Sequence, residues 1–60
     1  MESTKALEIL KTAILLEKRG KAFYEKMAEQ TQSPEARKIF TTMAEEEKAH
    51  VEFLSVQFAH

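Results

Sequence analysis

Residues that interrupt helices are almost absent from this chain. Gly20 and Pro34 are its single glycine and its single proline among 60 residues. All ten acidic residues are glutamate, and none is aspartate, which suits helices. The sequence therefore predicts an all-α protein.

The sequence indicates the start of a helix at Ser33, Pro34 and Glu35. Serine is a preferred N-cap, proline suits the first helical position, and an acid is favoured in the first turn. We predict one helix from about Thr4 to Gln30 and a second from about Pro34 to Phe58. Because the connection is short, the two helices are expected to pack as an antiparallel hairpin over residues 1–60.

Length and composition limit how such a hairpin can be stabilised. A chain of 60 residues is one small domain with little interior. It has no cysteine, so disulfides, thiolate metal sites and cysteine catalysis are excluded. The remaining means of stabilising so small a domain are a metal held by nitrogen and oxygen ligands and a partner chain.

Charge and hydropathy restrict the partners. The net charge of -1 gives no basic surface for nucleic acid, and no apolar run is long enough to cross a membrane. The first ten residues lack the pattern of a signal peptide. We expect a cytoplasmic protein that binds neither nucleic acid nor membrane.

Each expected helix has one apolar stripe, and each stripe contains polar residues that a packed helix should not need. Glu17 lies in the first stripe, and Glu47 and His50 lie in the second. A buried carboxylate is costly unless something pairs with it. The stripes are Ala6, Leu10, Ala13, Glu17, Gly20, Tyr24 and Met27, and Ala36, Phe40, Met43, Glu47, His50, Leu54 and Phe58.

These three polar residues are expected to meet. Glu17 lies about 21 Å before the turn at about 1.5 Å per residue, and Glu47 and His50 lie about 20 and 24 Å after it. In an antiparallel hairpin they fall at one height and face one seam. Three ionisable groups at one level of an apolar seam form a candidate site.

The spacing and residue types suit a metal ion. Glu47 and His50 are neighbours on a helix surface, so one ion can take both. Carboxylates with an imidazole favour iron, manganese or zinc over calcium. One hairpin offers too few ligands, whereas two copies offer the four Glu and two His of two-metal four-helix bundles. We therefore expect a homodimer that forms a four-helix bundle.

The amino-acid sequence around these residues resembles the rubrerythrin branch of the ferritin-like superfamily. The resemblance extends from about Ala13 to Leu54. It rests on AILLEKRG at 13–20, Phe23-Tyr24, Ser33-Pro34-Glu35 and AEEEKAH at 44–50.

The resemblance implies roles for individual residues. Glu17 would be a terminal ligand, Glu47 would bridge two irons, and His50 would bind one of them. Tyr24 matches a family tyrosine that hydrogen-bonds to a ligand glutamate. Proteins of this family bind two irons and react with oxygen or peroxide, so two iron ions per dimer are expected, with manganese or zinc as alternatives.

The chain also departs from the family pattern. Family domains carry two hairpins in one chain, so this hairpin either dimerises or is half of a longer protein. An extra carboxylate that the family carries one turn after one of its lone glutamates would fall at Gly20. Because no cysteine-rich electron-transfer domain is present, peroxide reduction would need an external electron donor.

Three functions stay open at this level. The first is a ferroxidase- or peroxidase-type di-iron protein, and the second is a metal-binding module without turnover. The third is a metal-free helical dimerisation module in which Glu17, Glu47 and His50 are incidental polar residues.

Overall fold

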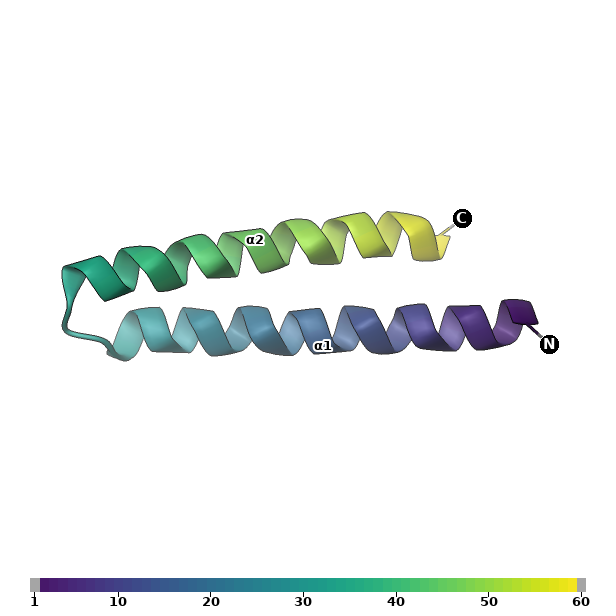
Figure 1. The fold of residues 1–60 in the computed structure, drawn as a ribbon, viewed down its shortest axis with the longest axis horizontal. Coiled ribbons are helices and arrows are strands. Elements are labelled where there is room, and N and C mark those ends of the chain that lie inside the picture. The colour runs from purple at the N-terminus through teal and green to yellow at the C-terminus, as the bar shows by residue number, and fades with distance from the viewer. Residues whose placement is uncertain (1, 60) are drawn as a thin grey trace.

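The protein is a helical hairpin, described by a computed structural model over residues 2–59 (Figure 1). α1 spans Glu2–Gln30 and α2 spans Pro34–Ala59. The two helices pack against each other, and the described part of the chain is all-α as predicted. They run antiparallel, so its first and last residues lie at the same end (Figure 1).

The helix limits lie close to the expected ones. α1 begins at Glu2 rather than at about Thr4, and α2 ends at Ala59 rather than at about Phe58. Gly20 lies inside α1 and does not interrupt it. Glycine weakens a helix interior but does not remove a backbone hydrogen bond as proline does.

The start of α2 has the predicted cap. The backbone N–H of Ala36 donates to the Ser33 hydroxyl at 3.1 Å, and Arg37 N–H donates to the Ser33 carbonyl at 2.9 Å. Glu35 places an acid in the first turn. Serine therefore satisfies one of the N–H groups that a helix start leaves without a partner.

A second cap closes the end of α1, and it comes from α2. The Arg37 guanidinium donates from Nε to the Ala28 carbonyl at 3.1 Å and from Nη2 to the Thr31 carbonyl at 2.8 Å. Ala28 lies in the last turn of α1 and Thr31 directly follows the helix, where intrahelical donors run out. One arginine thus ties the two helices together at the turn.

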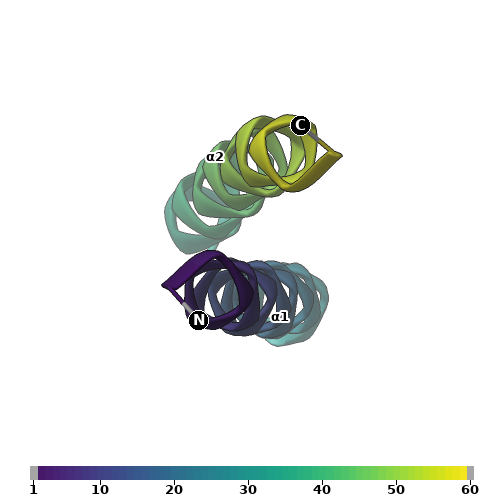
Figure 2. The same ribbon diagram turned by 90° about the vertical axis from the view of Figure 1, so that its right-hand side faces the viewer.

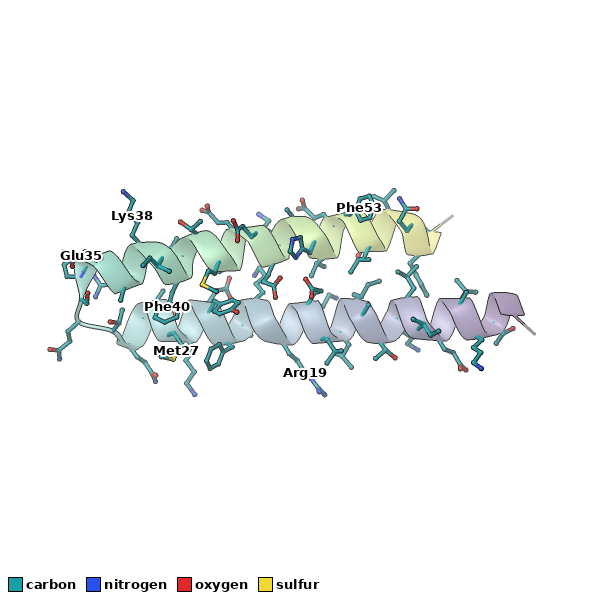
Figure 3. The ribbon with its side chains drawn as sticks, in the orientation of Figure 1. Arg19, Met27, Glu35, Lys38, Phe40 and Phe53 are labelled. Carbon is teal, nitrogen blue, oxygen red and sulfur yellow. The ribbon has the colours of Figure 1, made fainter. Side chains whose placement is uncertain are left out.

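The seam between the helices is thin. Ala44, 6% exposed, is the one buried residue found in the described chain. Phe40 points toward α1, where its ring stacks on Tyr24 with centroids 6.3 Å apart (Figure 3). Figure 2 shows the helices crossing rather than lying strictly parallel. Neither helix, over the residues described, is long and apolar enough to span a membrane.

One side of the hairpin is charged. Both helices line an open groove there, and its walls include Lys18, Lys21 and Glu25 of α1 and Lys48 and Glu52 of α2. Lys21 and Glu25 form an ion pair of 2.7 Å. Charged side chains on a groove of this kind are well solvated.

The opposite side carries large apolar side chains, each more than half exposed. Residues spaced by seven stay in one row of a helix. Each helix has one such row of apolar residues, and both rows lie beside the seam and not in it. They lie on the side of the seam toward which the position three residues after Glu17 or Glu47 is displaced. We call these residues the apolar face: Ile9 (64% exposed), Leu16 (57%), Phe23 (56%), Ile39 (58%) and Phe53 (64%).

Candidate metal centre

Glu17, Glu47 and His50 converge between the middle of α1 and the middle of α2. Each offers one donor atom, and these atoms all lie within 4.8 Å of one another. Two elements position them, since Glu17 comes from α1 and the other two come from adjacent turns of α2. The structure thus brings the three predicted site residues together, while their role as ligands stays a prediction.

The imidazole of His50 is the centre of the cluster. Its Nδ1 lies 2.7 Å from Glu17 Oε1 and 2.9 Å from Glu47 Oε1. A protonated Nδ1 can donate to either carboxylate. The contact with Glu17 crosses between the helices, whereas the contact with Glu47 joins neighbouring turns of α2.

The three side chains differ in their exposure. Glu47 is the most enclosed at 18%, Glu17 follows at 31%, and His50 is 59% exposed. His50 lies one turn after Glu47, so it is displaced from the seam toward the apolar face. The cluster is therefore closed by the hairpin on one side and open on the side of the apolar face.

Proximity changes the proton affinities of this cluster. The hydrogen bond with Glu47, and then that with His50, lower the pKa of the Glu17 carboxyl below its ordinary value. The hydrogen bonds to Glu17 and Glu47 raise the pKa of the His50 imidazole. Both shifts favour a positive charge on the histidine beside a negative charge on Glu17.

Tyr24 lies in the aromatic part of the seam. Its ring stacks on Phe40 and meets Phe23 edge-on, with centroids 5.5 Å apart. Among the hydrogen bonds of residues 2–59, none joins its hydroxyl to Glu17 or Glu47. Its predicted hydrogen bond to a ligand glutamate stays a prediction for the assembled protein.

Gly20 was not among the predicted site residues, yet it borders the cluster. A Cβ atom built on Gly20 would lie 2.5 Å from Oε2 of Glu47. The signal available in the sequence was its place in the apolar stripe, one turn after Glu17. That position indicates room on the seam but does not say which group takes it.

Comparison with known proteins identifies a family. The sequence model of the family described as Rubrerythrin matches residues 8–59 of the 60-residue chain. No curated protein sequence and no solved structure matches significantly. The family match covers all three clustered residues and confirms the resemblance seen between about Ala13 and Leu54. The chain belongs to the rubrerythrin family.

Proposed function

We propose that two copies of this chain form a four-helix bundle that binds two iron ions through Glu17, Glu47 and His50 of each copy. The observation that carries the proposal is the convergence of these three donor groups within 4.8 Å, in a chain whose family implies iron binding.

The donor set fits iron. Two carboxylates with one imidazole suit iron, manganese or zinc, and disfavour calcium. An ion with bonds of about 2.1 Å holds its ligands at most about 4.2 Å apart, so the three side chains need only small rotations to reach one ion. Nδ1 is the imidazole atom that faces both carboxylates, which makes it the nitrogen available to a metal here.

Charge supports the same reading. Two carboxylates that point at one position repel each other unless a positive charge lies between them. In the metal-free hairpin a protonated His50 can supply that charge, since its contacts with the two glutamates raise the pKa of its imidazole. A divalent cation would supply twice as much and would take the place of the proton.

A single hairpin does not complete the site. It brings two carboxylates and one imidazole, and the open side of the cluster faces the apolar face. Two copies provide four Glu and two His, the ligand set of di-iron four-helix bundles. Rubrerythrin-like domains usually oligomerise.

The apolar face supports a second copy as its cover. The hairpin exposes 4962 Å², whereas a compact monomeric protein of 6.9 kDa exposes about 4000 Å². The excess of about 1000 Å² is close to the roughly 800 Å² that each partner buries in a standard interface. Pairing through this face would bury Leu16 and Phe53 and leave the charged groove in solvent.

The protein groups would hold the metals, orient them and limit water. Glu47, the most enclosed of the three, would hold metal deepest in the seam, and Glu17 and His50 would complete the ligand set of each copy. When bound, the iron pair supplies two electrons, one from each Fe(II), which with two protons reduce one hydrogen peroxide to two waters. Restoring Fe(II) needs an external electron donor.

An iron-oxidation assay tests this function. The purified protein is loaded anaerobically with Fe(II) and mixed with hydrogen peroxide or with oxygen, and Fe(III) is followed by absorbance. We expect faster oxidation than in buffer, lost in Glu47→Gln and kept in Glu45→Gln, a control because Glu45 lies outside the cluster, in a pocket that Lys21 and Lys48 also line.

The outcomes separate the three functions. Binding of Fe(II) without faster oxidation indicates a metal-binding module without turnover. Absence of binding contradicts the metal centre and leaves a helical dimerisation module, in which His50 is satisfied by its two glutamates.

A further inference from the structure

Gly20 occupies a position where a helix gains nothing from glycine. It lies in the middle of α1, far from either end. Glycine there is less favourable than alanine because its backbone loses more freedom on folding. The α-helix therefore supplies no reason for glycine at this position.

The neighbour of Gly20 supplies a reason. The three nearest atoms to a Cβ built at Gly20 all belong to Glu47: Oε2 at 2.5 Å, Cδ at 3.5 Å and Cγ at 3.9 Å. These atoms are the end of a side chain and not the backbone of α2. Close approach of the two helices is thus not what requires glycine here.

The two oxygens of Glu47 have different surroundings. Oε1 lies 2.9 Å from His50 Nδ1, while Oε2 lies over the bare Cα of Gly20. A side chain at position 20 would push Oε2 away and would turn Oε1 with it, since both belong to one rigid carboxylate.

We infer that Gly20 is a positioning residue of the metal centre, whose missing side chain leaves room for the Glu47 carboxylate between the helices. This inference rests on the proposed function. Glu17 and His50 would keep their contact in a Gly20→Ala chain, so the loss would fall on Glu47 alone.

Fold and site have opposite requirements at this position. Alanine favours the helix, and the flexible end of Glu47 can move aside at little cost to folding. The same movement takes the most enclosed carboxylate out of reach of an ion. A substitution that stabilises the chain and weakens its site is the pattern expected of a residue kept for function.

The metal arm of the test compares Gly20→Ala with Ser55→Ala. Ser55 is an exposed helix residue outside the cluster, so its change to alanine also favours helix but leaves the site alone. Fe(II) affinity is measured anaerobically, and Co(II) absorption reports the ligand geometry. We expect Gly20→Ala to bind Fe(II) about 10–100-fold more weakly with an altered Co(II) spectrum, and Ser55→Ala to match the unmodified protein.

The metal-free arm tests the contact itself. Melting temperatures are compared for Gly20→Ala in the unmodified protein and in Glu47→Ala, with the mass of each variant checked by light scattering. We expect Gly20→Ala to raise the melting temperature more in the Glu47→Ala background, because there is then no Glu47 carboxylate that has to move aside. Two residues that do not touch would give equal rises.

The outcomes are distinct. Equal rises in both backgrounds, or unchanged Fe(II) affinity in Gly20→Ala, would overturn the positioning role while the metal centre stands. Failure of the unmodified protein to bind Fe(II) would overturn the proposed function, and the positioning role with it.

Discussion

Nδ1 of His50 lies 2.7 Å from Oε1 of Glu17, although 33 positions separate the two residues in the chain. This contact joins the middle of α1 to the middle of α2. It is made by a group that is more than half exposed, on the side of the hairpin that carries the apolar face. This polar link between the helices is therefore also the open edge of the candidate metal centre.

The His50 contacts predict how the metal-free protein responds to pH. His50 has a raised pKa, so its stabilising effect is complete below the ordinary histidine value and is lost as pH rises through the raised pKa. Glu17 has a lowered pKa, so its effect is present above the ordinary glutamate value and is lost as pH falls through the lowered pKa. The contribution of the pair is complete between about pH 4.3 and 6.5.

NMR titration of His50 checks this prediction. We expect its pKa to lie above the ordinary value and to fall in Glu17→Gln, with Glu45→Gln as the matched control. A His50 pKa that does not move in Glu17→Gln would contradict the contact. Metal binding requires the neutral imidazole, so Fe(II) uptake should weaken below the His50 pKa and should release protons there.

Two adjacent leucines test which side of the hairpin pairs. Leu16 belongs to the apolar face at 57% exposure, and Leu15 is 49% exposed beside Lys11 and Lys18. We expect Leu16→Gln to weaken the dimer and Leu15→Gln to leave it intact. Losing one buried leucine per copy costs at least about 3 kcal/mol per dimer, or about a hundredfold in Kd.

Sedimentation equilibrium measures both variants. Equal dimer affinity in Leu16→Gln and Leu15→Gln would show that the apolar face is not the interface. Weaker pairing in Leu15→Gln alone would place the interface on another side of the hairpin.

The Tyr24→Phe variant distinguishes a role of Tyr24 in the metal site from a role in packing. In Tyr24→Phe the ring stack on Phe40 is kept and only the hydroxyl is lost. If the hydroxyl orients a ligand glutamate in the dimer, Fe(II) affinity should fall about 10–100-fold while the metal-free melting temperature stays the same. Unchanged affinity would leave Tyr24 as an aromatic residue of the seam.

The sequence was sufficient to predict the two helices because the residues that mark their limits act locally. Ser33 and Pro34 mark the start of α2, and no other proline interrupts either helix. Counting residues from the turn was sufficient to bring Glu17 to the level of Glu47, since the rise of a helix is regular.

Contacts that depend on how far a side chain reaches could not be predicted from the sequence. The cap that Arg37 places on the Ala28 and Thr31 carbonyls depends on the geometry of the turn. Lys38, the next residue, points away from α1, and nothing in the local sequence distinguishes the two roles (Figure 3). The contact between Gly20 and Glu47 likewise needs the relative position of two helices.

Metal content and mass, measured on one purified sample, test the central claim most directly. Elemental analysis is combined with light scattering for the unmodified protein, Glu47→Ala and the control Glu45→Ala. We predict a dimer with about two metal ions, retained in Glu45→Ala and lost in Glu47→Ala. A homogeneous protein that takes up no Fe(II), Mn(II) or Zn(II) would contradict the metal centre.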